Sequence, residues 1–108
     1  MEIAKYIYSI LKGQINIMWS WGFNSPRSLP DDEGLIFKVQ GFKHKGFVAV
    51  VYKAGTDLFD VILYNRQMAT KSKTEGVYFD TLVDTIDFLV ERTSDYEDRV
   101  KQEYSYMF

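Results

Sequence analysis

The sequence contains one histidine and no cysteine, which limits the chemistry that its side chains can perform. His44 lies in the segment FKHKG (42–46), whose glycine and lysines predict an exposed turn. A general base needs an orienting partner and a metal site needs further ligands, and the neighbouring residues supply neither. No thiolate is available, and no serine stands in a G-x-S-x-G pattern. We therefore expect His44 to be an ordinary surface residue and the protein to be no enzyme, with no catalytic residues.

Four acidic residues recur at helical spacing near the end of the chain: Asp80, Asp84, Asp87 and Glu91. Such a stripe could hold a divalent cation. However, a polar stripe opposite an apolar one is typical of a surface helix, and acidic groups early in a helix are favoured by its dipole. The calcium-loop pattern and the glycine-rich phosphate loops are both absent. We therefore expect no metal and no cofactor.

Basic residues concentrate in the middle of the chain. Residues 34–76 carry seven basic and three acidic residues, whereas residues 77–108 carry three and eight. Lysines at one turn and in the neighbouring strands could neutralise phosphates, and Phe42, Phe47 or Tyr64 could stack on bases. The candidate residues for nucleic-acid binding are Lys43, His44, Lys45, Arg66, Lys71 and Lys73. The sequence pI of 5.3 and the usual use of lysine at turns and sheet edges argue against this function.

Apolar spacing predicts the elements that position these residues. Residues 2–12 have the helical pattern, and Lys12 and Gly13 suit the end of that helix. Residues 15–23 alternate, so they predict a strand with Trp19 and Trp21 on its buried side. Both tryptophans are therefore expected in the core. The segment 24–34 contains both prolines and is expected to be a loop.

A meander and a helix are expected after this loop. Strands are predicted at 35–40, 47–53 and 58–64, with a weaker edge strand at 66–73. From Val77 the helical period returns, with one apolar face made by Phe79, Leu82, Val83, Ile86, Leu89 and Val90. A third helix begins after Ser94, in an S-x-x-E capping pattern, or the second helix continues.

The fold class follows from this order of elements. With 46% apolar residues and a length of 108, the chain should bury one core. We expect a single α+β domain at 1–93, with an N-terminal helix, a four- or five-stranded mainly antiparallel sheet and one or two C-terminal helices. Residues 94–108 are expected to form a C-terminal helix or a partly ordered tail.

One face of the predicted sheet is left without helices. The alternation places apolar side chains there beside Lys38, Lys53 and Asp60, and a large exposed apolar surface usually marks a contact site. The candidate protein-interaction residues are Ile36, Phe47, Val51, Ile62 and Tyr64. The cover could be residues 94–108, a second copy of the chain in a homo-oligomer, or another protein partner.

The sequence also bears on the membrane. No run of 18 or more apolar residues is present, and Lys5 and Lys12 interrupt the N-terminal segment MEIAKYIYSILKGQ. We expect a cytoplasmic protein with no membrane partner.

Residues 41–65 carry a family resemblance. A G-x-x-x-K-G turn at 41–46 and a D-x-[FY]-D-V strand at 57–61 resemble a group of small uncharacterised proteins encoded by mobile elements of gut bacteria. The resemblance implies an accessory protein with a helix-sheet-helix layout and no assigned activity. The uncovered apolar face favours a function as a non-enzymatic protein-interaction module that binds through this second sheet face. The alternative is a nucleic-acid-binding accessory protein that uses the basic turn.

Overall fold

The computed structural model describes residues 2–91. The helices are α1 (Glu2–Lys12), α2 (Ile15–Ser20) and α3 (Leu82–Val90), with short 3₁₀ helices at Pro30–Asp32 and Phe79–Thr81. The strands are β1 (Asn24–Ser28), β2 (Gly34–Gln40), β3 (Lys45–Lys53), β4 (Leu58–Tyr64) and β5 (Thr70–Val77). The expected helix or tail at 94–108 lies outside the described residues.

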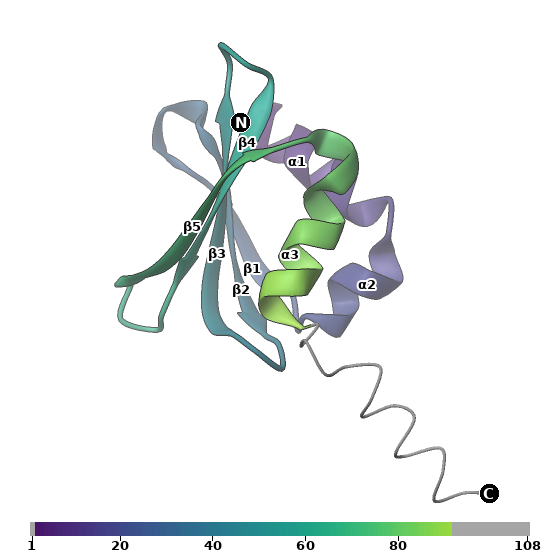
Figure 1. The fold of residues 1–108 in the computed structure, drawn as a ribbon, viewed down its shortest axis with the longest axis vertical. Coiled ribbons are helices and arrows are strands. Elements are labelled where there is room, and N and C mark those ends of the chain that lie inside the picture. The colour runs from purple at the N-terminus through teal and green to yellow at the C-terminus, as the bar shows by residue number, and fades with distance from the viewer. Residues whose placement is uncertain (1, 92–108) are drawn as a thin grey trace, which may run out of the picture.

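The five strands form one antiparallel sheet in chain order, β1-β2-β3-β4-β5. Short hairpins join the last four strands, as the glycine-punctuated sequence predicted. Helices α1, α2 and α3 all lie on one side of the sheet, and no helix of residues 2–91 lies on the other side (Figure 1). The α+β class is therefore confirmed.

The core lies between the sheet and its helices. Phe37, Val48 and Leu63 stand opposite one another on β2, β3 and β4, and all three are buried. From the helices, Ile7 and Leu11 of α1 and Ile86 of α3 pack into the same cluster. Each large side chain buried in this way stabilises the fold by about 1.5–3 kcal/mol. The predicted division of the meander into a covered face and an open face is confirmed.

The predicted strand at 15–23 is wrong. Residues 15–20 form α2, and a left-handed Gly22 follows at φ 68°. Of the two tryptophans only Trp21 lies in the core, so the expected burial of Trp19 is also wrong. Trp21 is 0% exposed, whereas Trp19 is 56% exposed. A strand would place Met18 and Trp21 on opposite faces, but both side chains are fully buried. Met18 and Trp21 are three residues apart and share the buried side of a helical turn.

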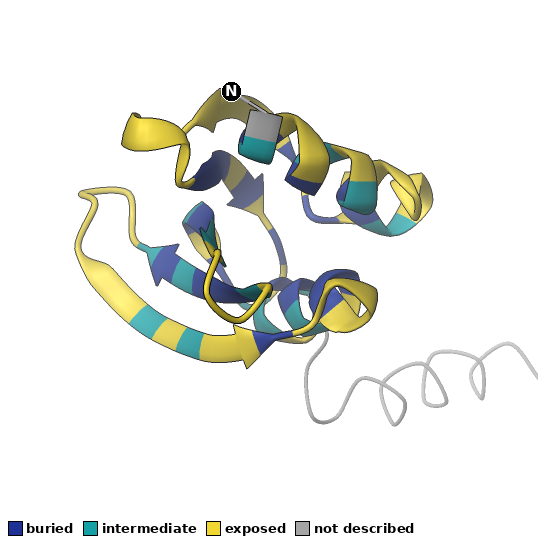
Figure 2. Ribbon diagram, turned by 90° about the horizontal axis from the view of Figure 1, so that it is seen from above, coloured by how far each residue is buried: buried dark blue, intermediate teal, exposed yellow. Residues whose placement is uncertain are grey.

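The predicted loop at 24–34 contains the edge strand β1. Its five residues are all exposed, so no apolar alternation marks it in the sequence. Pro26 fits there because an edge strand leaves some N–H groups without a sheet partner. The weak fifth strand exists, but it lies at 70–77 rather than 66–73 and forms the exposed outer edge of the sheet (Figure 2).

The helix predicted from Val77 begins later than expected. Val77 ends β5, residues 79–81 form the 3₁₀ helix, and α3 starts at Leu82. Phe79 is consequently 58% exposed instead of lying on the buried stripe, because a 3₁₀ turn has three residues per turn and rotates the side chain away.

Candidate binding surface

The open face of the sheet carries the five predicted protein-interaction residues. Cross-strand neighbours form rows: Lys38, Phe47 and Tyr64 in one, and Ile36, Ala49 and Ile62 in the next. Val51 stands opposite Asp60 in a third row. The sequence predicted the face of these side chains correctly, because successive residues of a paired strand point to opposite faces of the sheet.

The apolar side chains of this face are partly screened by their neighbours. Ile36 is only 8% exposed, and Ala49, its neighbour in the same row, is buried. Phe47, Val51, Ile62 and Tyr64 are half-buried. The centre of the face is therefore a half-buried apolar strip, defined here as Phe47, Val51, Ile62 and Tyr64.

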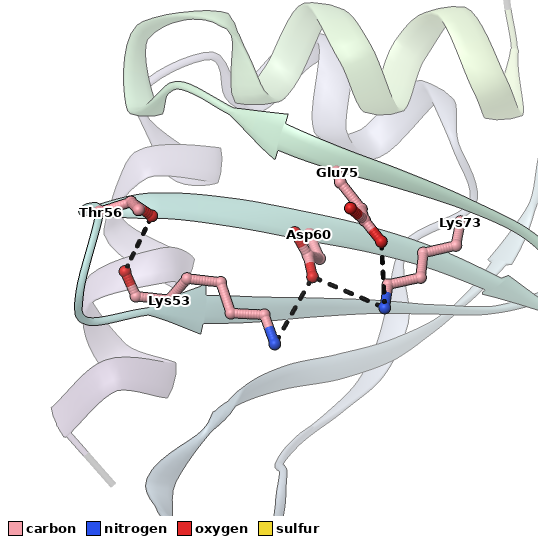
Figure 3. Close-up of polar contacts among 5 residues, drawn as sticks. All are labelled: Lys53, Thr56, Asp60, Lys73 and Glu75. Atoms are coloured by element: carbon pink, nitrogen blue, oxygen red, sulfur yellow. Dashed lines mark hydrogen bonds and ion pairs between the residues drawn. The ribbon is translucent and has the colours of Figure 1, made fainter.

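A charged cluster lies at one end of the strip (Figure 3). The Asp60 carboxylate is 3.6 Å from Lys53 Nζ and 3.9 Å from Lys73 Nζ, and Lys73 Nζ is 3.5 Å from the Glu75 carboxylate. Asp60 is 5% exposed, and a buried carboxylate needs such partners. These ion pairs link the strands β3, β4 and β5 and pair the carboxylates of Asp60 and Glu75 with lysines.

Four further cations surround the strip. Arg27 is opposite Ile36, Lys38 is opposite Phe47, Lys45 lies at the start of β3, and Arg66 follows β4. Among residues 2–91 none of these four makes an ion pair with a carboxylate. The open face therefore presents an excess of positive charge around its apolar strip.

The predicted basic turn is occupied by structural contacts. The N–H groups of Lys43 and His44 donate to the Val90 carbonyl at the end of α3, at 2.8 and 3.3 Å. Lys43 Nζ donates to the Phe88 carbonyl at 2.6 Å and lies 4.2 Å from the centre of the Phe88 ring. A cation there is favoured by the helix dipole. Through Lys43 and the backbone of His44, this hairpin caps the end of α3.

His44 is not the surface residue that the sequence predicted. It is 2% exposed, and its Nε2 lies 3.2 Å from the Phe47 carbonyl oxygen. Because a carbonyl only accepts, this contact requires a proton on Nε2. Burial lowers the pKa of His44, the Phe47 carbonyl opposes that shift, and the nearby charge of Lys71 lowers it further. The ring is held near β3 and β4, and the backbone N–H of His44 is bound to α3, a contact between distant segments that has no local signal in the sequence.

The six nucleic-acid candidates therefore divide into two groups. Lys45, Arg66 and Lys73 belong to the open face. Lys43 and His44 pack at the end of α3, and Lys71 Nζ donates to the Lys43 carbonyl at 3.4 Å. Sequence reasoning missed Arg27, because β1 was taken for a loop.

The motif residues on which the predicted resemblance depends have structural roles. Phe59 and Val61 belong to the core, and Asp60 belongs to the charged cluster. The Tyr52 hydroxyl donates to the Asp57 carboxylate across the hairpin, and this hydrogen bond raises the pKa of Tyr52. The resemblance itself stays a prediction.

Comparisons with family models, curated proteins and solved structures found no match to this chain. Within residues 2–91, no helix is long and apolar enough to cross a membrane. The described residues also contain no group of three or more acidic or histidine side chains placed to hold a metal ion. The surface chemistry of the fold is therefore the basis for assigning a function.

Proposed function

We propose that this protein is a non-enzymatic binding module whose open sheet face takes an acidic protein partner. The observation that supports this most strongly is the excess of positive charge on the open face. Both acidic groups there are already paired with Lys53 and Lys73, while Arg27, Lys38, Lys45 and Arg66 surround the half-buried apolar strip.

The two components of this face would contribute differently to binding. Apolar side chains at the centre of an interface supply most of the affinity when water leaves them. Cations around them speed association with an acidic partner and exclude basic ones. A half-buried strip inside a basic rim therefore has the composition of a specific and salt-sensitive protein interface.

A nucleic acid is a poorer fit to the same face. Base stacking needs open aromatic rings, but Phe47 and Tyr64 are half-buried and Lys38 Nζ lies 5.6 Å from the centre of the Phe47 ring. Lys43, His44 and Lys71 are held at the α3 end. Three of the six residues predicted to bind phosphates therefore already make contacts within the protein, away from the open face.

The proposal is tested by selecting peptides from a random display library on the folded protein. We expect the retained peptides to be enriched in Asp and Glu beside apolar residues, and their binding to weaken as salt rises from about 0.05 to about 0.5 M. Retained peptides without acidic enrichment would contradict the proposal. So would stronger binding of an oligothymidylate than of any selected peptide.

A further inference from the structure

One end of the open face is hollowed. The hollow has a volume of about 360 Å³ and extends from β1 across β2 and β3 to the turn after β4. Its lining consists of Asn24, Lys38, Val39, Gln40, Gly46, Phe47 and Arg66. It is therefore a shaped site within a face that is otherwise a broad surface.

The charge inside the hollow has one sign. Lys38 and Arg66 are both part of the lining, and none of the described residues that line it is acidic. On the open face the acidic Asp60 lies four residues along β4 from Tyr64, which corresponds to about 13 Å. The formal charge of the lining is accordingly not cancelled by a neighbour.

Several polar groups of the lining have spare hydrogen-bonding capacity. In the described part of the chain, the Arg66 guanidinium and the Gln40 side-chain amide make no hydrogen bond or ion pair. Lys38 Nζ contacts the Phe47 ring but has no carboxylate partner there. An anion in the hollow could use these donors without breaking an existing bond.

The walls of the hollow are fixed by the fold. The Gln40 N–H donates to the Trp21 carbonyl at 2.7 Å, and Asn24 Nδ2 donates to the Gly22 carbonyl at 2.8 Å. A Cβ added to Gly46 would lie 2.3 Å from the Tyr64 carbonyl oxygen, so the strands are close there. A preformed site loses less entropy on binding.

The arrangement of donors suits a phosphoryl group better than a carboxylate. One arginine fork can satisfy a planar carboxylate by itself. A phosphoryl group has three terminal oxygens and a charge of about −1.5 to −2, so it can use cations from two directions. Lys38 on β2 and Arg66 after β4 approach from opposite sides of Phe47 and supply two positive charges.

We propose that this hollow binds the phosphoryl group of a phosphorylated side chain on the partner. This inference rests on the proposed protein-binding function and names the chemistry that the partner carries. The apolar strip begins at Phe47 and Tyr64 beside the hollow. The strip can bury apolar side chains that flank a phosphorylated serine or threonine, and a polynucleotide has no such side chains.

The test is an amide-shift NMR titration of the full chain with short blocked peptides, Leu-phosphoserine-Leu, Leu-Ser-Leu and Leu-Glu-Leu. A 5′-phosphorylated thymidine tetranucleotide and inorganic phosphate are further probes. We expect the phosphopeptide to shift residues 38–40, 46–47 and 66 and to bind at least about tenfold more tightly than Leu-Ser-Leu. Lys38→Gln and Arg66→Gln should each weaken it by about tenfold.

Arg27→Gln is the matched control, because Arg27 is an exposed cation of the same face outside the hollow. It should weaken the phosphopeptide by less than about threefold. Equal binding of the phosphopeptide and Leu-Ser-Leu would overturn the inference, as would equal losses in Arg27→Gln and Arg66→Gln. Preferential binding of the tetranucleotide would overturn the assignment to a protein. If selected acidic peptides bind the strip but phosphorylation has no effect, the hollow is misassigned and the proposed function stands.

Discussion

Trp21 joins three parts of the molecule through one side chain. Its ring stacks on Phe37 of β2, with the ring centres 6.3 Å apart, and its Nε1 donates to the Asp87 carboxylate of α3 at 3.0 Å. Trp19, two residues earlier, has one edge contact with Phe23 and otherwise lies at the surface. The two tryptophans therefore differ in what they contribute to stability.

Replacing each tryptophan by alanine tests this difference. Trp21→Ala should lower the free energy of unfolding by about 3–5 kcal/mol, because it leaves a large cavity and removes the hydrogen bond from the indole to Asp87. Trp19→Ala should lower it by about 1 kcal/mol or less. Urea unfolding followed by circular dichroism measures both variants, and equal losses would show that Trp19 is also part of the core.

His44 provides a second test at the level of one residue. The charge that acts on the ring is that of Lys71 on β5, and the backbone groups of Phe47 and Tyr64 act against it. Because the pKa of His44 is lowered in the fold, the unfolded chain binds more protons than the folded chain just below pH 6.5. The stabilisation is therefore complete above the unfolded pKa and is lost as the pH falls through this range.

We expect thermal stability to decrease more between about pH 7 and about pH 5 in the wild type than in His44→Gln. Glutamine can still donate a hydrogen bond to the Phe47 carbonyl, but it does not titrate. Calorimetry of both proteins at each pH gives the comparison. Parallel curves would mean that His44 is not responsible for the pH dependence.

At the level of elements, the β2–β3 hairpin holds the end of α3. Gly41 allows this contact, because a Cβ there would lie 2.3 Å from Val90 Cγ1 and 2.4 Å from the Val90 carbonyl oxygen. The Phe42 N–H donates to the Glu91 carboxylate at 2.9 Å. The hairpin and the end of the helix are therefore packed backbone against backbone.

Gly41→Ala should destabilise the protein by about 1–3 kcal/mol, because backbone atoms of α3 have to move. Gly55 is the matched control, since an added Cβ there meets nothing within 4 Å. Gly55→Ala should change the free energy of unfolding by less than about 0.5 kcal/mol. Urea unfolding measures both, and a neutral Gly41→Ala would contradict the described packing.

The elements also show how far the sequence could predict the fold. Helix α1 and strand β2 were predicted because each has a regular apolar period. Strands β3 and β4 were predicted as largely apolar runs separated by turns that contain glycine. Helix α2 has six residues, too few for its period to be distinguished from alternation over Ile15, Ile17 and Trp19. Strand β1 has no buried side chain, and its place is set by pairing with β2.

At the level of the whole molecule, the charges that are segregated along the chain lie on two sides of the fold. The basic middle of the sequence forms most of the sheet, whereas Asp80 and Asp84 lie on the helical side. The open-face residues could be predicted, because strand alternation determines which side they occupy. The positions of Lys43 and His44 could not, because they depend on the distant α3.

The central claim is that the open face, and not the helical side, receives the acidic partner. The most direct test is the affinity of one selected acidic peptide for the wild type, for Ile62→Asp on the strip and for Phe79→Asp on the helical side. Ile62 is partly exposed and Phe79 is exposed, so both variants should tolerate the new carboxylate. Circular dichroism checks that each variant is folded. We predict a loss of at least about tenfold for Ile62→Asp and little change for Phe79→Asp. A loss in Phe79→Asp alone, or equal losses in both, would contradict the account.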